Sequence, residues 1–326
     1  MRAIQIERTG GPDVMELVDV PIGEPGPGEV RVRHSAIGVN FIDTYYRSGL
    51  YAMQLPAVLG VEAAGVVEAV GPGVSHLTVG DRVGYSARTS GSYGEVRVLD
   101  ATPVFKLPAA IDFERAAAMM LKGLTVQYLL RRTQPREGLQ AGDMIVWHAA
   151  AGGVGLIACQ WAAALGLVVI GTAGSDEKCE LAKRHGAAHV INYRREDVVA
   201  RVRELTGGRG VKVVYDSVGK DTWDRSLDCL APFGLMVSFG NASGAVPPVN
   251  VLQLASKGSL YVTRPTLGHH LAKREAGEEM AAELFAMVES GKVKIEVGRR
   301  YKLEDAAQAH RDLESRNTTG SSILIP

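Results

Sequence analysis

Cysteine is scarce in this sequence, with only three among 326 residues, at positions 159, 179 and 229, and with no CxxC spacing. An odd number of isolated cysteines argues against a disulfide framework and against a four-cysteine zinc site. We therefore expect a protein of the reducing cytoplasm. The opening residues MRAIQIERTGG carry a charge at Arg2 and contain no long apolar run, so we expect no signal peptide.

Net charge is also absent, because 36 lysines and arginines balance 36 aspartates and glutamates. A neutral chain has no overall field that favours nucleic acid or an anionic membrane surface. Hydrophobic residues make up 46% and charged residues 22% of the chain. This composition is typical of soluble globular proteins and excludes disordered and fibrous ones.

No charged residue occurs between Asp143 and Asp176, a stretch long enough to cross a bilayer. The stretch contains clustered glycines together with His148 and Gln160, and its composition changes from β-branched to alanine-rich and back. This pattern predicts a strand, a helix and a second strand of a globular domain rather than a membrane span.

The length of 326 residues corresponds to about two domains at roughly 150 residues each. The first 120 or so residues contain short apolar runs separated by turn signals, such as Val30–Val32, Ala64–Val70 and Arg82–Tyr85. They predict a partly open barrel of short strands. We expect the chain after Pro265 to return to this domain, which gives one domain from residues 1–123 and 265–326 and a second from residues 124–264.

From about Leu124 the sequence alternates between helical and strand patterns, beginning with an alanine- and leucine-rich helix. Strands are predicted at Met144–His148, Leu167–Thr172, His189–Ile191, Val211–Tyr215, Leu235–Phe239 and Ser259–Val262, with helices at Gly153–Leu165, Asp176–His185, Asp197–Thr206 and Thr222–Cys229. Such repetition predicts an α/β fold with a six-stranded, doubly wound parallel sheet. In the tail we expect helices at Glu278–Ser290 and Glu304–Glu314, and strands near Val293–Ile295 and at Ser322–Ile325. The expected ligand site is a cleft between the domains.

A glycine-rich loop follows the first strand of the predicted sheet and precedes a helix. Ala150, Gly152 and Gly155 stand there in an AxGxxG arrangement. Small residues permit the tight turn and let backbone N–H groups approach a pyrophosphate at the positive helix N-terminus. Gly155 also lets the helix pack close to the sheet. The context predicts dinucleotide binding.

The end of the second strand indicates which dinucleotide binds. An enzyme that uses NAD usually has an acid there, about 20 residues beyond the loop, to hold the ribose 2′-hydroxyl. Here the strand ends in VVIGTAGS, and Asp176 is predicted instead to begin a helix, where it complements the macrodipole. Ser175, Lys178 and Tyr193 remain, and a hydroxyl and an ammonium suit a 2′-phosphate, which favours NADPH. The alternative is that Lys178 is a solvated helix residue.

Several strings in the chain are specific to one family: GVNFIDTYYRSGLY, LGVEAAGVVEAVGPGV, LKGLTV, HAAAGGVGLIACQWA, VYDSVG and LESRNTTGSSILIP. They resemble bacterial NADPH:quinone oxidoreductases, the zeta-crystallin-like, zinc-free branch of the medium-chain dehydrogenases/reductases. The resemblance runs from residue 2 to Pro326. It implies a Rossmann domain and a β-rich, GroES-like catalytic domain.

Zinc-dependent alcohol dehydrogenases resemble this chain around GVNFID and LGVEAAG, but they have a metal-binding cysteine where Asn40 stands and a histidine where Val61 stands. Glu62 remains alone. Catalytic zinc needs three protein ligands, and an amide and a valine cannot replace two of them. We therefore expect no metal.

The resemblance implies hydride or electron transfer from NADPH to a quinone without a metal. Hydrogen-bond donors then stabilise the developing phenolate-like oxyanion. The resemblance places Asn40 and Tyr45 in this role beside the nicotinamide, with Tyr51 and Arg264 lining the cleft. The alternatives are a turn-forming role for Asn40 and a core position for Tyr45.

The resemblance also implies a set of cofactor contacts, some of which coincide with the residues already singled out. These contacts are Gly152, Gly153 and Val154 at the pyrophosphate, Ser175, Lys178 and Tyr193 at the adenosine phosphate, and Ser217, Phe239, Gly240, Asn241 and Arg316 elsewhere along the dinucleotide. For Arg316, the alternative is a helix C-terminal arginine that complements the dipole.

Two other functions stay open. A reductase of α,β-unsaturated ketones or aldehydes would share the pocket, and some zeta-crystallins bind AU-rich RNA. The neutral charge and the lack of an aromatic RNA platform make an RNA-binding role secondary. The resemblance also implies a homodimer, formed through the last strand of the sheet near Leu260–Thr263.

Overall fold

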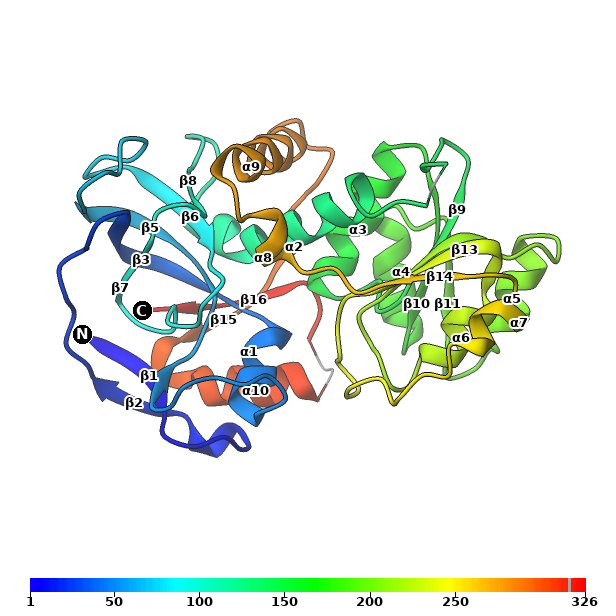
Figure 1. The fold of residues 1–326 in the computed structure, drawn as a ribbon, viewed down its shortest axis with the longest axis horizontal. Coiled ribbons are helices and arrows are strands. Elements are labelled where there is room, and N and C mark those ends of the chain that lie inside the picture. Colours follow the sequence, from blue (N-terminus) through cyan, green and yellow to red (C-terminus); the bar gives the residue numbers. More distant parts are fainter. Residues whose placement is uncertain (136, 316–317) are drawn as a thin grey trace. The chain divides into compact units, whose positions relative to one another are not determined.

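The computed structural model describes residues 1–135, 137–315 and 318–326, so the predicted cofactor contact Arg316 lies outside the described residues. The chain divides into two compact units (Figure 1). Unit 1 consists of Met1–Leu124, Leu267–Glu289 and Ile295–Pro326, and unit 2 consists of Thr125–Thr266 with Ser290–Lys294.

Unit 2 contains a sheet of six strands in the order β11, β10, β9, β12, β13, β14. Their bounds are β9 (Met144–Trp147), β10 (Val168–Ala173), β11 (His189–Asn192), β12 (Val211–Asp216), β13 (Leu230–Ser238) and β14 (Tyr261–Thr263). Every neighbouring pair is parallel. The chain starts in the middle of the sheet and extends first to one edge and then to the other. This confirms the predicted doubly wound sheet.

Helices connect these strands close to their predicted positions. They are α3 (Gly153–Ala164), α4 (Asp176–Arg184), α5 (Val198–Leu205), α6 (Trp223–Asp228) and α7 (Leu252–Ser256), of which α7 was not expected. The strands bury β-branched and other apolar residues such as Val146, Ile170 and Val214. Between Asp143 and Asp176 the chain forms β9, α3 and β10, as predicted. Among the described residues, no helix is long and apolar enough to cross a membrane.

Unit 1 contains two sheets, and the prediction of a β-rich domain is confirmed. A three-stranded sheet has the order β2 (Glu16–Asp19), β1 (Arg2–Ile6), β4 (Ala57–Val58). A seven-stranded sheet has the order β15 (Val297–Lys302), β16 (Ser321–Ile325), β3 (Glu29–Val39), β5 (Glu62–Val70), β6 (Arg82–Ser86), β8 (Val104–Lys106), with β7 (Val96–Asp100) also paired to β3. Among the described residues, four α-helices lie wholly in this unit: α1 (Phe41–Ser48), α8 (Leu267–His270), α9 (Arg274–Glu289) and α10 (Ala306–Glu314).

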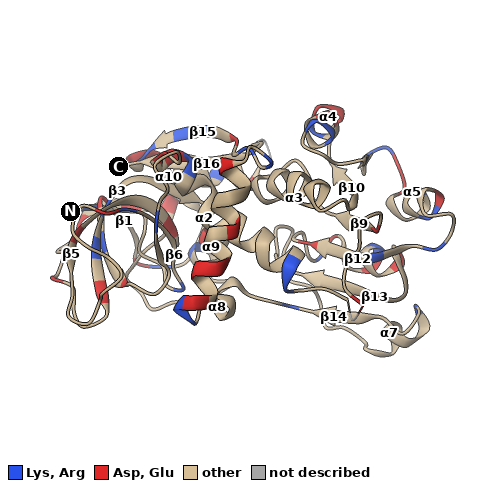
Figure 2. Cartoon of the chain, turned by 90° about the horizontal axis from the view of Figure 1, so that it is seen from above, with Lys and Arg blue, Asp and Glu red and all other residues tan. Residues whose placement is uncertain are grey.

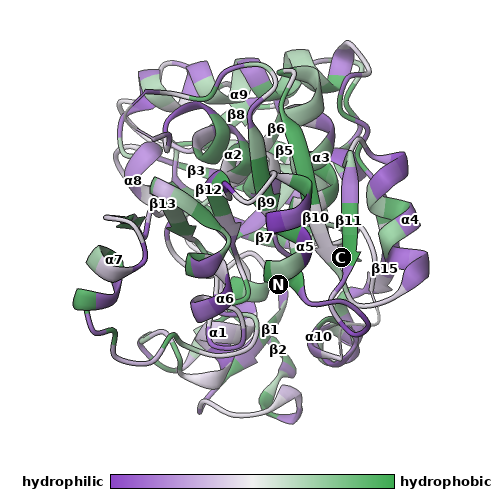
Figure 3. Cartoon of the chain, turned by 90° about the vertical axis from the view of Figure 1, so that its right-hand side faces the viewer, coloured by the Kyte–Doolittle hydropathy of each residue, from purple (hydrophilic) through white to green (hydrophobic). Residues whose placement is uncertain are grey.

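The longest strand of unit 1, β3, has 11 residues and contacts three neighbours, so it exceeds the short strands expected. Its close pairing with β5 requires glycine at position 65, because a Cβ atom there would lie 1.8 Å from the Arg33 carbonyl oxygen. The core of the unit contains Val32, Ile37 and Tyr85, all of them fully buried. Figure 2 shows charges of both signs along both units, and Figure 3 shows hydrophobic residues on strands such as β5 and β11.

The start of one predicted helix and the position of one predicted strand were wrong. Helix α2 (Phe113–Arg131) begins well before Leu124, because the Asp112 carboxylate accepts the Arg115 N–H at 2.8 Å and caps its first turn. No strand forms at Val293–Ile295, because the side chain of Gln160 accepts the Lys294 N–H at 2.8 Å and donates to the Lys294 carbonyl oxygen at 3.0 Å. The strand lies instead at β15, parallel to β16.

Candidate functional site

The glycine-rich loop of unit 2 joins β9 to α3. Gly152 is the N-cap of α3, and its N–H donates to the Ala149 carbonyl oxygen at 3.0 Å. A Cβ atom at Gly155 would lie 2.5 Å from that same oxygen, so only glycine lets the helix start this close to the loop. The first turn of α3 contains no acid. Its first amides, including those of Gly153 and Val154, lack intrahelical acceptors, and amides in this position are suited to binding an anion.

The end of β10 brings together the residues predicted for the adenosine phosphate. A Cβ atom at Gly174 would lie 2.4 Å from the Tyr193 hydroxyl oxygen, so the phenol lies directly against this turn. Ser175 is the N-cap of α4, and its hydroxyl oxygen accepts the Lys178 N–H at 3.3 Å. Glycine, hydroxyl and phenol therefore lie side by side at the start of the helix that carries Lys178.

Asp176 begins α4, as predicted, and its carboxylate is already engaged. One oxygen accepts from the Asn192 amide at 2.7 Å, and the other lies 2.6 Å from the Arg195 guanidinium. The acid therefore faces the end of β11 and pairs with a cation. These contacts support a role at the helix start rather than at a ribose hydroxyl.

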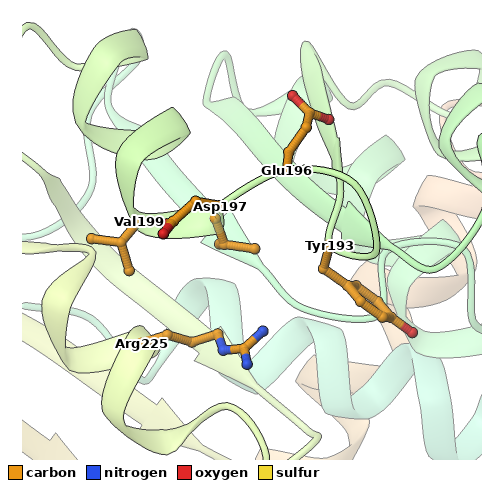
Figure 4. A pocket seen from close by; sticks show the side chains of 6 residues that line it. Tyr193, Glu196, Asp197, Val199 and Arg225 are labelled. Atoms are coloured by element: carbon orange, nitrogen blue, oxygen red, sulfur yellow. The ribbon is translucent and has the colours of Figure 1, made fainter.

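A pocket of about 310 Å³ lies next to Tyr193 (Figure 4). It is lined by Tyr193, Glu196, Asp197, Val198, Val199 and Arg225. Only Tyr193 was singled out from the sequence. Arg225 belongs to α6, and no sequence motif pointed to it.

The ends of β12 and β13 place four further predicted contacts together. A Cβ atom at Gly240 would lie 2.4 Å from the Ser217 carbonyl oxygen. The Phe239 N–H donates to the Asp216 carbonyl oxygen at 2.8 Å, and Asn241 follows directly. The backbone of Ser217 therefore lies against residues 239–241 at the carboxyl edge of the sheet, where ligands of this fold bind.

A buried hydrogen-bond chain crosses the same edge. The Asp216 carboxylate accepts from the Ser226 hydroxyl at 2.7 Å, so the Ser226 oxygen accepts from His148 Nε2–H at 2.9 Å. His148 Nδ1 then accepts from the Thr172 hydroxyl at 2.9 Å. Burial lowers the pKa of His148 and so favours the neutral ring. A neutral ring is needed here, because Nδ1 accepts a hydrogen bond while Nε2–H donates one. The other Asp216 oxygen accepts the Val218 and Gly219 N–H groups and shapes the loop beside Ser217.

In unit 1, Asn40 is buried and is the N-cap of α1. Its backbone N–H donates to Asp43 Oδ2 at 2.8 Å, and its side-chain amide donates to Glu62 Oε2 at 2.7 Å. Tyr45 is 8% exposed and packs edge-on against Tyr51 with ring centroids 5.3 Å apart. The structure therefore brings Asn40, Tyr45 and Tyr51 together around one helix. Capping and burial also match the alternatives stated for Asn40 and Tyr45.

Arg264, the fourth residue predicted for the acceptor site, belongs to unit 2 and follows β14. Burial raises the pKa of the Tyr128 phenol, and the nearby Arg264 guanidinium opposes this rise. The predicted position of Arg264 beside the acceptor stays a prediction.

Asp43 is fully buried, and its carboxylate accepts from Asn40 and from the Tyr93 hydroxyl at 2.9 Å. Tyr93 also contacts His310 Nε2 at 3.0 Å. Burial raises the pKa of Asp43 from 3.8 to about 7, against the opposing effects of Asn40, Tyr93 and Lys122. Asp43 therefore titrates near neutral pH within the network that caps α1.

We predict that Asp43 makes the free energy of unfolding fall as pH rises. Between its unfolded pKa near 3.8 and its folded pKa of about 7, the folded state holds a proton that the unfolded state releases. The contribution of Asp43 to the free energy of unfolding is complete below pH 3.8. It falls by about 1.4 kcal/mol per pH unit between the unfolded and the folded pKa. Urea unfolding of wild type and Asp43→Asn from pH 4.5 to 8 measures it. The free energy of unfolding of the variant is expected to rise relative to that of wild type as pH rises. A difference between the two proteins that does not change with pH contradicts the prediction.

The parallel sheet with its glycine-rich loop, together with the β-rich unit, defines the class of medium-chain dehydrogenases/reductases. Residues 26–109 match the alcohol dehydrogenase GroES-like domain family, and residues 153–286 match the zinc-binding dehydrogenase family. The chain is 57% identical to a quinone oxidoreductase of Pseudomonas aeruginosa, over 100% of this chain and 99% of that one. The crystal structure of the Escherichia coli quinone oxidoreductase complexed with NADPH superposes with a TM-score of 0.97, at 53% identity and full coverage of both chains. The chain belongs to the quinone oxidoreductase family, which confirms the predicted resemblance.

The residues near Glu62 do not fit a catalytic zinc ion. Val61 offers only hydrocarbon, and the Asn40 amide nitrogen already donates to Glu62. In the part of the chain that the structure describes, no three His, Cys, Asp or Glu side chains gather closely enough to hold a metal ion. A zinc-binding family description therefore does not carry over to the donor set of this chain.

Proposed function

We propose that this protein is an NADPH-dependent quinone reductase that works without a metal. The observation that carries the proposal is the end of β10, where Gly174, Ser175 and Tyr193 adjoin and where Asp176 pairs with Arg195. A hydroxyl, a phenol and the neighbouring Lys178 suit the 2′-phosphate that distinguishes NADPH from NADH. The closely related E. coli enzyme is described as a complex with NADPH.

The cofactor supplies the hydride when it is bound, and the chain supplies its binding site. We propose that the first-turn amides of Gly152, Gly153 and Val154 hold the pyrophosphate. Ser217, Phe239, Gly240 and Asn241 would hold the nicotinamide half, because they adjoin at the carboxyl edge of the sheet. Arg316, outside the described residues, stays a predicted contact.

Asn40 and Tyr45 are proposed to donate hydrogen bonds to the acceptor oxygen as it becomes phenolate-like, with Tyr51 and Arg264 lining its site. Donors held in place before the reaction stabilise such an oxyanion without reorganisation. The burial of Asn40 and the hydrogen bond from its side-chain amide to Glu62 support this role, because they prevent the amide from rotating freely.

Oxidation of NADPH and of NADH, followed at 340 nm with 1,4-benzoquinone after chelator treatment, tests the function. Rapid turnover that prefers NADPH and resists the chelator supports the proposal. Cofactor binding without quinone turnover overturns it. An enone serves as the comparison acceptor, because a 2-haloacrylate reductase of Burkholderia is 45% identical over 99% of this chain and 98% of that one.

We further propose that the protein forms a homodimer through β14. Among the described residues, β14 pairs only with β13, so its other edge carries no partner strand. Tyr261 is 50% and Val262 38% exposed on this strand. An apolar strand edge of this kind favours pairing with a second copy.

Val262→Lys is expected to weaken the dimer at least tenfold, because a buried lysine at a paired edge opposes association. Light scattering coupled to size-exclusion chromatography measures the change in mass across a dilution series. Val79→Lys, which alters a 67% exposed valine of unit 1, is the matched control and leaves the mass unchanged. A wild-type monomer at all concentrations contradicts the proposal.

A reducing compartment such as the cytoplasm is proposed because Cys159, Cys179 and Cys229 are all free and buried. Burial raises the pKa of each thiol, which lowers the reactivity of all three. Thiol titration is expected to detect them after denaturation and not before.

A further inference from the structure

A lysine and a glutamate are buried together beneath Asn40. The Lys122 ammonium of α2 lies 3.4 Å from Glu62 Oε2, with side-chain exposures of 7% and 0%. The ammonium also donates to the Val39 carbonyl oxygen at 3.4 Å. Burying two charges is expensive, and an apolar pair of similar volume is often at least as stable. Stability alone therefore does not explain this pair.

The Glu62 carboxylate is surrounded by donors. Its Oε1 accepts the Leu121 N–H at 2.6 Å, and its Oε2 accepts from both Asn40 and Lys122. A Cβ atom at Gly38 would lie 2.1 Å from Oε2, so glycine is required where β3 passes the carboxylate. These donors and the close approach of Gly38 hold the Glu62 carboxylate in one position and suit its ionised form.

An ionised carboxylate only accepts hydrogen bonds, so it decides which way the Asn40 amide faces. The NH₂ group must point to Glu62, and the amide oxygen must point away from it. One N–H is used by Glu62, and the direction of the other is then fixed. A protonated Glu62 would itself donate, and it would no longer enforce this orientation.

We propose that Lys122 is a positioning residue, whose ammonium keeps Glu62 ionised so that Glu62 orients the Asn40 amide toward the acceptor. The inference rests on the proposed function, in which Asn40 contacts the substrate. Because the two charges cancel, the pair contributes orientation rather than a net field. Lys122 acts through two other residues and is not itself a donor to the acceptor.

The electrostatics around Glu62 agree with this role. Burial raises the pKa of Glu62, and Lys122, Asn40 and the Leu121 amide oppose the rise. Asp43, Tyr85 and Tyr93 are the other titratable groups that respond to its charge. Among the described residues, the Lys122 ammonium is the cation that lowers the pKa of Glu62, so its removal strengthens the effect of burial, which raises that pKa.

The test compares K122M, which keeps most of the length of the side chain and removes its charge, with the double variant E62Q/K122M. At pH 7, K122M is expected to lower kcat for 1,4-benzoquinone by about 10- to 100-fold, the loss typical of a displaced reacting group. The kcat of K122M recovers as pH rises, because Glu62 then ionises and again accepts from Asn40. In E62Q/K122M, kcat is lowered by the same factor at every pH, because glutamine does not ionise. K122R restores part of the rate.

Two further measurements separate positioning from folding. The Kd for NADPH, measured by fluorescence without any acceptor, is expected to change less than about threefold, because fixed dinucleotide contacts lie elsewhere. Arg97→Met is the matched control: it removes another buried cation of unit 1, bonded to Ser92 and Thr89. It lowers stability and leaves the kcat pH profile unchanged.

A loss in K122M that is the same at every pH overturns the proposal, as does wild-type kcat in K122M. If K122M does not fold, the double variant, which buries no unpaired charge, decides the question. If kcat of the double variant equals that of wild type, the proposal is overturned. If kcat is lowered by the same factor at every pH, the proposal is supported. Failure of the wild-type enzyme to reduce quinone contradicts the proposed function instead, so the two failures are distinguishable.

Discussion

Replacing Asn40 by alanine lowers kcat for quinone reduction by about 100-fold, the loss typical of removing one fixed donor to a developing oxyanion. The side-chain amide is buried and held by Glu62, so no solvent molecule replaces it in the same orientation. The KM for NADPH is expected to stay nearly constant, because the proposed contacts to the dinucleotide are made by other residues. Steady-state kinetics with 1,4-benzoquinone measure both quantities.

Asn40 is also the N-cap of α1, so alanine removes a cap as well as a donor. Loss of a cap destabilises a protein by about 1 kcal/mol. Asn40→Ser is therefore the matched control, because serine caps a helix well but has no amide to orient toward the acceptor. It is expected to recover stability and to keep the rate loss. Wild-type kcat in Asn40→Ser contradicts a catalytic role and leaves Asn40 as a cap alone.

The fold of unit 2 was predictable because its signals are local. Each buried strand, such as β9, is a short apolar run, and each helix begins at a recognisable residue such as Ser175. The strand expected at Val293–Ile295 does not form, because of a contact between residues far apart in sequence. Gln160 is distant in sequence and bonds both backbone groups of Lys294, so these groups are satisfied without a strand.

In the candidate site, too, local features were predictable and features that depend on distant residues were not. The phosphate loop was predictable because Gly152 and Gly155 act within one turn of chain, where spacing determines geometry. The orientation of Asn40 was not, because it depends on Glu62 and on Lys122, which are 22 and 82 residues away in sequence. A sequence gives residue types but not which carboxylate is buried beside which ammonium. That pairing appears only when β3, β5 and α2 pack together.

Replacing Lys178 by alanine is expected to raise the KM for NADPH by about 10- to 100-fold, the range of one charge-assisted hydrogen bond to a phosphate. The KM for NADH is expected to change little, because NADH lacks the 2′-phosphate. Lys178 lies in the first turn of α4, where its backbone N–H donates to the Ser175 cap, and Ser175 follows the Gly174 turn that contacts Tyr193. Initial rates with each dinucleotide at saturating quinone measure the selectivity.

Lys183→Ala is the matched control for this prediction. Lys183 belongs to the last turn of the same helix and pairs with Glu180 at 2.8 Å, so its loss removes an equal charge from α4 away from the turn. It is expected to leave both KM values within about twofold, since exposed pairs contribute little. A rise in the KM for both dinucleotides in Lys178→Ala contradicts recognition of the 2′-phosphate. It would then follow that Lys178 supports α4 as a solvated helix residue, and that discrimination between NADPH and NADH lies with Ser175 and Tyr193.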